Sequence, residues 1–371
     1  MKIGIITYHR SHNYGAVLQA YGTKTALTAL GHDADIIDYW PDYRKGMYDL
    51  LDFSFFKKAD MSLVAKLKRS VFVLLALPKR SVRYNKFQDF ISNKLGVKGP
   101  IKYTTGDKIS TGYDAYVFGS DQVWRYNTYP LHKGFDEVYW GKYPVNAQKI
   151  TYAASMGTIE MDKSREDFIK KNFGNFKSVS VREDSLKETI TSIIPDAKIT
   201  QVLDPTFLVS KTDWLKIIPA SGKKSAKKYV LFYNLIKSQE AFNLVDRIAA
   251  KFGYDIIELN GVVNPLEFSS RYAQTTGPID FLSLIAQSEF VVSTSFHGVA
   301  FSIIFEKQFY ALGMKNNSGR VASLLTSLTI PDRLVDNITP DLDVRIDYNE
   351  VNKKLDALRE QSINFLKTEL K

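Results

Sequence analysis

Gln287-Ser-Glu-Phe-Val-Val-Ser-Thr-Ser-Phe-His-Gly-Val-Ala-Phe-Ser-Ile-Ile-Phe-Glu306 is the stretch that decides the fold. Two apolar runs, 290–293 and 298–305, flank a short polar turn, which predicts a buried strand followed by a buried helix. His297 falls in the first turn of that helix, where free backbone N–H groups and the helix dipole favour an anion. A neighbouring anion favours a charged imidazole, so His297 is a candidate proton donor. The alternative is that Ser295 only caps the helix and His297 packs under a loop.

The bulk composition predicts a soluble, cytoplasmic protein of two domains. The chain has 371 residues, of which 44% are hydrophobic and 13% aromatic, enough for two sizeable cores. It has no cysteine, which excludes disulfides, thiol nucleophiles and thiolate metal sites. The apolar run at the N-terminus is too short for a signal peptide, and the uncharged run 70–78 is too short to cross a bilayer.

Positive charge is concentrated in one segment. The net charge is +10, and residues 41–96 hold twelve Lys or Arg against five Asp or Glu. No zinc-finger spacing or aromatic RNP run is present, so anionic small molecules or lipids are better candidates than nucleic acid. Apolar residues at helical spacing predict an apolar helix face: Met61, Val64, Leu67, Val71, Leu74 and Leu75. Basic residues surround and follow it: Lys57, Lys58, Lys66, Lys68, Arg69, Lys79, Arg80, Arg83 and Lys86.

Two interpretations of this basic segment remain open. It is either a solvated helical pair packed on a sheet or a peripheral contact with an anionic membrane surface.

The first 38 residues predict a βαβ unit and therefore a parallel sheet. Strand 3–7, helix 16–30, a terminating glycine and strand 34–38 follow one another. Ligands of such sheets bind beyond the carboxyl ends of the strands. The loop after the first strand contributes the candidate residues His12, Asn13 and Tyr14, and it has no G-x-G-x-x-G dinucleotide motif.

Two further loops carry candidate residues. Ser120, Asp121 and Gln122 follow strand 114–118 and can hydrogen-bond sugar hydroxyls or cap a helix. Arg182 follows strand 178–181, where it can grip a carboxylate or phosphate bidentately, or form an ion pair with Asp204 or Glu183.

The alternation of strands and helices resumes after an irregular stretch at 209–228. The sequence therefore predicts an α/β protein of two Rossmann-like domains, 1–210 and 211–371, facing an interdomain cleft. A helix over 347–370 is expected to close the chain.

Seven motifs, in this order, resemble the polysaccharide pyruvyl transferase family over roughly residues 3–334. They are Asn13-Tyr14-Gly15-Ala16, Leu18-Gln19, Gly119-Ser120-Asp121-Gln122-Val123-Trp124, Tyr152-Ala153-Ala154-Ser155, Val181-Arg182-Glu183, Leu203-Asp204-Pro205-Thr206 and Thr294-Ser295-Phe296-His297-Gly298. The resemblance implies a GT-B-like fold with the acceptor on the first domain and the donor on the second. It also implies transfer of pyruvate from phosphoenolpyruvate to sugar hydroxyls of a cell-surface polysaccharide or exopolysaccharide, often lipid-linked, as a ketal.

The resemblance also implies roles for residues. His297 and Arg182 match the family's catalytic, donor-binding positions, and Ser295, Phe296 and Gly298 complete the donor loop. Some relatives carry arginine where this chain has Ser295, so Lys315 or Arg320 in the next loop is expected to supply the cation.

Two other functions are considered. A GT-B glycosyltransferase would need a carboxylate for the nucleotide ribose, and Glu306 lies at the far end of the predicted helix from the phosphate loop. A non-catalytic carbohydrate-binding assembly protein would not need His297. No metal or other cofactor is expected, because the five histidines lack paired ligand spacing apart from His9 and His12.

Overall fold

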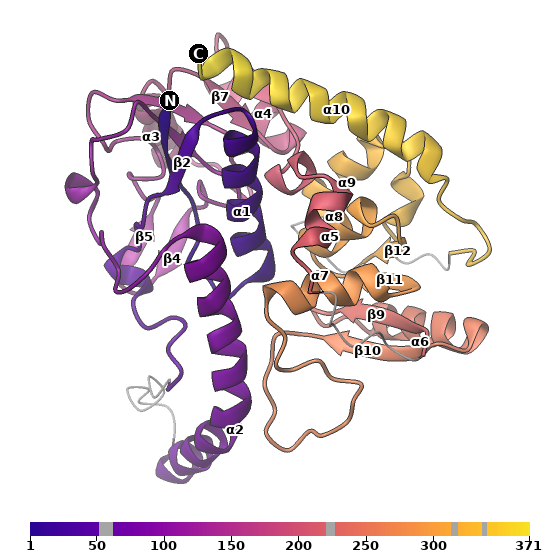
Figure 1. Ribbon diagram of the computed structural model, residues 1–371. Coiled ribbons are helices and arrows are strands. Elements are labelled where there is room, and N and C mark those ends of the chain that lie inside the picture. The colour runs from indigo at the N-terminus through magenta and orange to yellow at the C-terminus, as the bar shows by residue number, and fades with distance from the viewer. Residues whose placement is uncertain (52–61, 220–226, 313–317, 336–339) are drawn as a thin grey trace.

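Two parallel four-stranded sheets organise the chain (Figure 1). The computed structural model describes residues 1–51, 62–219, 227–312, 318–335 and 340–371. The first sheet has the order β2-β1-β3-β6, with β1 Lys2–Ile6, β2 Asp33–Ile36, β3 Ala115–Phe118 and β6 Gln148–Thr151. The second has the order β10-β9-β11-β12, with β9 Tyr229–Tyr233, β10 Asp255–Leu259, β11 Phe290–Ser293 and β12 Gln308–Ala311. The predicted α/β fold with two Rossmann-like halves is confirmed.

The predicted elements agree with the structure to within about three residues at each end. The first half contains α1 Tyr14–Ala29, α3 Lys163–Phe173, α4 Asp184–Ile193, β7 Val179–Val181, β8 Ile199–Gln201 and the hairpin of β4 Asn127–Tyr129 with β5 His132–Gly134. The second contains α5 Lys211–Lys216, α6 Gln239–Phe252, α7 Pro278–Gln287, α8 Phe296–Ile304, α9 Ser318–Ser327 and α10 Tyr348–Glu369. Periodicity succeeded here because each element buries one face or both.

Helices α1 and α8 each follow a strand of one of the two sheets, α1 after the loop 7–13 and α8 after a two-residue turn. Asn13 caps α1, because its side chain accepts a hydrogen bond from the Ala16 N–H. Helix α8 starts at Phe296, three residues after the buried strand β11 ends. Both helix N-termini therefore lie beyond the carboxyl ends of parallel strands, where ligands of this fold class bind.

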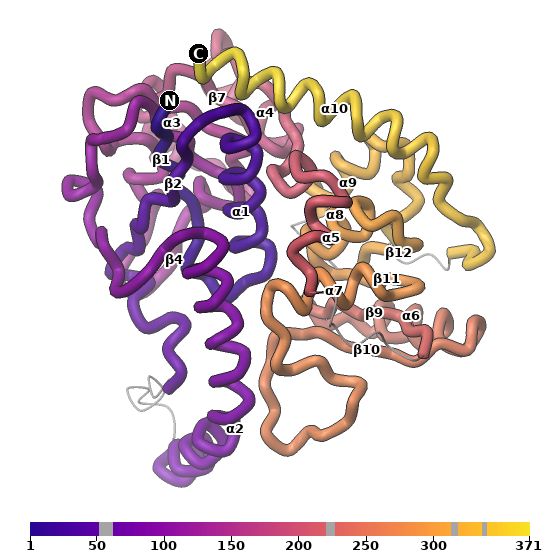
Figure 2. The backbone as a smooth tube through the Cα atoms, viewed as in Figure 1, coloured from indigo at the N-terminus to yellow at the C-terminus, as the bar shows by residue number. Residues whose placement is uncertain are grey.

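The two halves are tightly joined (Figure 2). The Tyr14 ring of α1 stacks on Phe281 of α7 at a centroid distance of 4.8 Å, and its hydroxyl donates to the Thr276 carbonyl at 3.0 Å. Helix α10 crosses back to the first half, where Ser362 Oγ accepts from the Leu203 N–H at 3.0 Å. One apolar cluster consequently runs through both sheets.

The basic segment is a single long helix where it is described. Helix α2 spans Leu63–Phe90, continues through Pro78 and ends in a π-helical turn at Ile91–Leu95. It extends away from the first half at the lower end of the molecule in Figure 1. Lys57, Lys58 and Met61, which the sequence assigned to this region, lie outside the described residues. Within the described ranges, no helix is both long and apolar enough to span a bilayer.

Candidate active site

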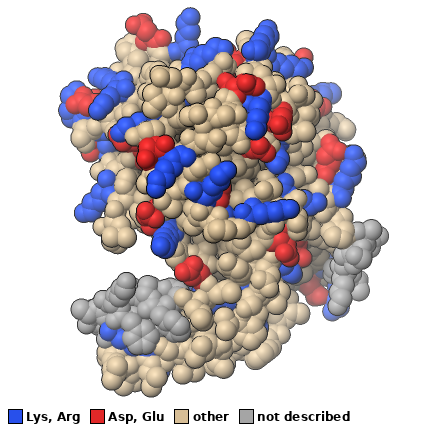
Figure 3. Space-filling model, turned by 60° about the vertical axis from the view of Figure 1, so that its left-hand side comes forward, with Lys and Arg blue, Asp and Glu red and all other residues tan. Residues whose placement is uncertain are grey.

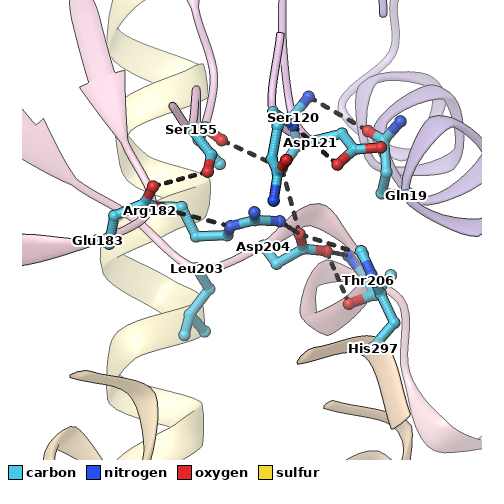
Figure 4. Close-up of polar contacts among 12 residues, drawn as sticks. Gln19, Ser120, Asp121, Ser155, Arg182, Glu183, Leu203, Asp204, Thr206 and His297 are labelled. Carbon is cyan, nitrogen blue, oxygen red and sulfur yellow. Dashed lines mark hydrogen bonds and ion pairs between the residues drawn. The ribbon is translucent and has the colours of Figure 1, made fainter. Parts of the chain in front are cut away.

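A fully buried carboxylate, Asp204, lies at the centre of the site (Figure 4). It caps the short 3-10 helix Pro205–Leu208, and its Oδ1 accepts from the Thr206 N–H at 3.0 Å and hydroxyl at 2.8 Å. Oδ2 accepts from Arg182 Nη1 at 2.6 Å and lies 3.2 Å from Ser120 Oγ. Burial alone would raise the pKa of Asp204, but His297 and the Arg182 charge hold that pKa well below its usual range.

Arg182 is a buried residue that directly follows the carboxyl end of β7. Its backbone N–H donates to the Ala154 carbonyl, and its side chain forms the ion pair with Asp204 that the sequence left open. Glu183 Oε2 lies 3.6 Å from Arg182 Nε, while Glu183 Oε1 accepts from Ser155 at 2.6 Å. In the described chain, Arg182 Nε and Nη2 make no hydrogen bond. The guanidinium therefore retains N–H groups that a ligand could use.

His297 reaches Asp204 from the second half of the chain. Its Nε2 lies 3.6 Å from Asp204 Oδ2, which is beyond hydrogen-bond distance, and has no hydrogen-bond partner in the described ranges. Gly15 of α1 closes the other side of the ring, because an added Cβ there would lie only 2.0 Å from Nδ1. Position 15 thus leaves room for His297 only as glycine.

A second arginine lies beside this cluster. The Phe296 ring has Arg182 at 4.5 Å and Arg320 at 5.9 Å from its centroid. Burial and the neighbouring Arg182 charge lower the pKa of Arg320 to about 10. With its oxygen turned toward Arg320, the Gln122 amide accepts from Nη2 at 2.9 Å and from Nη1 at 3.1 Å. Two mutually repelling guanidinium groups in one buried region favour an anion between or beside them.

Two cavities meet at Phe296 and Arg320. The interdomain cleft, of about 280 Å³, contains His297, Ser295 and Thr294 on the second half. Its first-half wall is formed by Tyr8, Ser11, Asn13, Ala16, Arg44, Met47, Tyr48, Asp121, Gln122, Arg125 and Tyr129. A separate cavity of about 300 Å³ under α9 and α10 is bordered by Arg182 and Asp204. Phe296 and Arg320 therefore separate the imidazole from the free face of Arg182.

The structure divides the predicted acceptor residues between the cleft and its surroundings. Asn13, Asp121 and Gln122 line the cleft. Ser120 is buried beneath it, with its N–H donating to Gln19 Oε1 at 3.2 Å. His12 stacks on Phe87 near the C-terminal end of α2, and Tyr14 packs between the two halves of the chain.

The predicted donor residues are placed more closely together. Ser295, Phe296, His297 and Arg320 line the cleft. Gly298 faces inward, where an added Cβ would lie 2.1 Å from Ser293 Oγ. Lys315 lies outside the described residues.

Sequence reasoning missed several cleft residues. It assigned no role to Tyr8, Arg44, Tyr48, Arg125 or Tyr129, all of which line the first-half wall. They come from separate loops with no shared spacing, so no local pattern indicates them. Asp204 is identified from the sequence as a possible ion-pair partner of Arg182 and as part of the motif 203–206, but not as a helix cap, although its place between a buried strand and a proline is a capping signal.

The fold and the site define a class: a GT-B-like α/β protein whose two Rossmann-like halves meet at a cleft. We call the buried cluster of Asp204, Arg182 and His297 the cleft floor, although only His297 among them lines the cleft itself. The chain belongs to the polysaccharide pyruvyl transferase family, whose model matches residues 13–316. The protein is accordingly a transferase of polysaccharide biosynthesis. The matched range contains the Asp204 cluster and most residues that line the cleft; Tyr8, Ser11 and Arg320 lie outside it.

Solved structures with similar folds are distant in sequence. Escherichia coli heptosyltransferase WaaC with ADP is 12% identical, with a TM-score of 0.41, over 96% of this chain and 100% of that chain. A putative UDP-N-acetylglucosamine 2-epimerase from Listeria monocytogenes is 12% identical, with a TM-score of 0.46, over 98% and 89%. The glycosyltransferase SnogD from Streptomyces nogalater is 12% identical, with a TM-score of 0.42, over 100% and 99%. A comparison with curated protein sequences gives no match.

Proposed function

We propose that the protein transfers pyruvate from phosphoenolpyruvate to hydroxyls of a sugar in a cell-surface polysaccharide or its lipid-linked precursor, forming a pyruvyl ketal. The observation that carries this proposal is the buried Arg182–Asp204–His297 cluster, which lies inside the range that matches the family and has Arg320 beside it. Phosphoenolpyruvate has a phosphate and a carboxylate; Arg320 and the N-terminus of α8 line the cleft, and the Arg182 guanidinium lies next to them on the other side of Phe296.

Each step of ketal formation has a residue suited to it. Protonation of the enol carbon produces an oxocarbenium ion, and His297 is the proton donor in this proposal. A first sugar hydroxyl attacks the adjacent carbon, which carries the phosphate, and loses its proton. A second hydroxyl then forms the second C–O bond to that carbon, closes the ring and loses its proton, while the C–O bond to phosphate breaks. Of the two protons released, one replaces the proton that His297 gave to the methyl group and the other leaves with phosphate. The arginines stabilise the leaving phosphate.

Asp204 acts through its neighbours in this mechanism. It contacts both Arg182 and His297 while its other oxygen is held by Thr206. Such a fixed carboxylate keeps the guanidinium and the imidazole at one spacing and leaves little freedom for either to turn away. We therefore assign it a positioning role. Ser295 contributes only a backbone turn and a hydroxyl, and Arg320 is the cation that replaces the arginine of some relatives.

Calorimetric binding of phosphoenolpyruvate tests the proposal. We expect saturable binding by the native protein and roughly 10- to 100-fold weaker binding by Arg320→Met, the usual loss for a charge-assisted hydrogen bond. His297→Asn should still bind the donor but lose ketal formation. Arg247→Met, an exposed arginine of α6, is the matched control and should bind normally.

Arg182→Ala is a weaker first variant, because it leaves Asp204 buried without its strongest partner and is expected to destabilise the fold. If the native protein ignores phosphoenolpyruvate and binds a nucleotide sugar instead, the proposal is wrong and a glycosyltransferase is indicated. No contact among the described residues favours that alternative. Glu306 bonds to Lys211 and to Asn352, beyond the far end of α8.

We also propose that α2 contacts the cytoplasmic face of an anionic membrane. Large apolar side chains on one face of the helix are exposed to solvent, with Leu63 at 80% and Leu67 at 66% of their full exposure. The same face includes Val64, Val71, Leu74, Leu75 and Val82. On the face drawn in Figure 3, the lower end of the molecule shows few charged side chains among the residues that are not grey, whereas both charges are interspersed above it.

The second half contributes to the same end of the molecule. Val262, Leu266 and Phe268 are exposed in the segment between β10 and α7. Lys79 of α2 donates to the Asn264 carbonyl at 3.0 Å and lies 4.8 Å from the Phe268 ring centre. Apolar side chains flanked by lysine and arginine fit the boundary between acyl chains and anionic headgroups.

Flotation with phosphatidylcholine vesicles, with and without phosphatidylglycerol, tests the membrane contact. Binding should require phosphatidylglycerol and be lost in Leu67→Glu/Leu74→Glu. Binding that survives charge reversal of Lys66, Lys68 and Arg69 would contradict an electrostatic contribution. A concentration-dependent dimer without vesicle binding would assign the apolar face to a second copy of the chain.

A further inference from the structure

Arg44 is a buried arginine at the wall of the cleft that forms no ion pair with any residue the structure describes. It ends the 3-10 helix Asp42–Arg44 and is only 4% exposed. Its guanidinium lies 3.7 Å from the centre of the Tyr8 ring and more loosely against Trp40 and Tyr43. Within the described ranges, its Nε has no hydrogen-bond partner.

The aromatic contacts do not account for this burial. A cation–π contact offsets only part of the cost of removing a guanidinium from water, and buried charges are normally paired. The nearby carboxylates are committed elsewhere. Asp136 accepts from Tyr39 at 3.0 Å and from Tyr43 at 2.8 Å, and Asp38 pairs with Arg10 and His9. No described carboxylate lies within ion-pair distance of Arg44.

The neighbouring groups also favour an anion. Tyr8 lines the cleft beside Arg44, and its buried hydroxyl has no partner in the described chain. Burial raises the pKa of Tyr8, so the phenol stays protonated and can donate. Arg125 lines the same wall, and among the cavity's described lining residues three arginines face a single carboxylate, Asp121.

We propose that Arg44, with Tyr8 and Arg125, binds an oxyanion group carried by the acceptor. Two sources share this chemistry: the diphosphate that links a glycan to a lipid carrier, and the carboxylate of an acidic sugar. A planar guanidinium binds either group bidentately. The inference rests on the proposed function, because it names the acceptor class for the wall of the cleft opposite His297.

Tyr48 and Tyr129 complete this subsite. Both rings line the cavity, and Tyr129 packs against Tyr43 at a centroid distance of 5.5 Å. Aromatic rings next to a cation are suited to a sugar that carries a negative group, because the ring face packs on the C–H groups while the guanidinium takes the oxyanion.

Calorimetry with inorganic pyrophosphate and with glucuronate, in parallel titrations, tests the inference and distinguishes its sources. We expect one of the two to bind, and Arg44→Met to weaken that binding about 10- to 100-fold. Arg333→Met is the matched control. Arg333 is equally buried and packs on Tyr310, but it lies in the second half and donates to the Val344 carbonyl at 3.0 Å. It should bind the probes normally.

Stability and donor binding complete the design. Arg44→Met should retain phosphoenolpyruvate affinity and lose less thermal stability than Arg333→Met, because it removes a charge that has no ion-pair partner among the described residues. Pyrophosphate binding that depends on Arg320 rather than Arg44 would overturn the inference, as would equal binding of both probes by the native protein and Arg44→Met. Failure of phosphoenolpyruvate to bind would contradict the proposed function alone, since the probes do not contact the donor residues in this proposal.

Discussion

Folded proteins usually expose charged side chains and bury large apolar ones. The floor of the cleft and the outer half of α2 depart from this distribution in opposite directions. The cleft floor buries charged groups, with Asp204, Arg182 and His297 each less than a tenth exposed. Helix α2 exposes leucines and valines that a folded protein normally buries. Neither arrangement stabilises the isolated chain, so each indicates a partner outside it.

The two regions differ in what they need from that partner. The floor is preorganised by hydrogen bonds among three segments of the chain, so a small anion can bind without large rearrangement. Helix α2 has no such fixed geometry on its outer face. It suits a partner that recognises area and charge rather than shape, as a lipid surface does.

Asp204→Asn should have the largest effect, because it leaves the Arg182 charge buried without its partner. We expect a loss of roughly 3–5 kcal/mol in the free energy of unfolding and loss of transfer activity. Urea unfolding at fixed pH measures the first. The control is Asp167→Asn, whose ion pair with Lys163 is exposed and should cost about 0.5 kcal/mol or less. Equal losses of stability in the two variants would show that the buried ion pair of Asp204 contributes no more to folding than an exposed one.

His12, at the junction of the two regions, should make stability depend on pH. Burial and the Arg83 charge lower the pKa of His12 to about 4, and its Nε2 lies 3.2 Å from Gln88 Nε2, which suits a neutral ring. As pH falls from about 6.5 to 4, His12 therefore becomes protonated in the unfolded chain while it stays neutral in the folded chain. Stability is present above that window and declines through it, by at most roughly 3 kcal/mol.

The pH series needs a variant that cannot titrate. His12→Phe keeps a ring between Tyr48 and Phe87 and should flatten the stability curve between pH 6.5 and 4. An unchanged slope in this variant would assign the acid sensitivity to other groups.

The sequence predicted the layers of the fold more completely than the site. The sequence predicts strands such as 290–293 and helices such as 239–252, because the spacing of apolar residues indicates which face of an element is buried. The length of α2 is harder to predict from the sequence, because Pro78 suggests a break whereas the helix continues through it. The outer apolar face of α2 was predicted correctly from spacing, but exposure is a property of the assembled fold.

The site was predictable only where one short motif carries the chemistry. His297 and Arg182 follow strands within recognisable motifs, and the structure brings both to Asp204. Arg44 and Arg125 are ordinary basic residues in their local sequence. Their places on one wall depend on how separate loops converge, which the spacing of residues along the chain does not encode.

Gly15→Ala tests the junction between α1 and His297 with a single methyl group. The new Cβ would lie 2.0 Å from Nδ1, so the imidazole or the helix must shift. We expect about 10- to 100-fold slower transfer, the usual result of a displaced catalytic group, with 1–3 kcal/mol lost from overpacking. Gly174→Ala is the control, because no atom lies near its added methyl. Normal activity in Gly15→Ala would remove His297 from the mechanism.

The outer face of α2 should show the smallest effect on folding. Leu67→Glu and Leu74→Glu should each change the free energy of unfolding by about 0.5 kcal/mol or less, because these side chains contact mainly solvent. Val73→Glu on the same helix is buried and should cost several times more, since it places a carboxylate in an apolar site. Urea unfolding of the three variants gives the comparison directly. A large loss of stability in Leu67→Glu would mean that the apolar face of α2 is covered in solution. That face would then have its partner within the folded protein, and only the cleft floor would indicate a partner outside it.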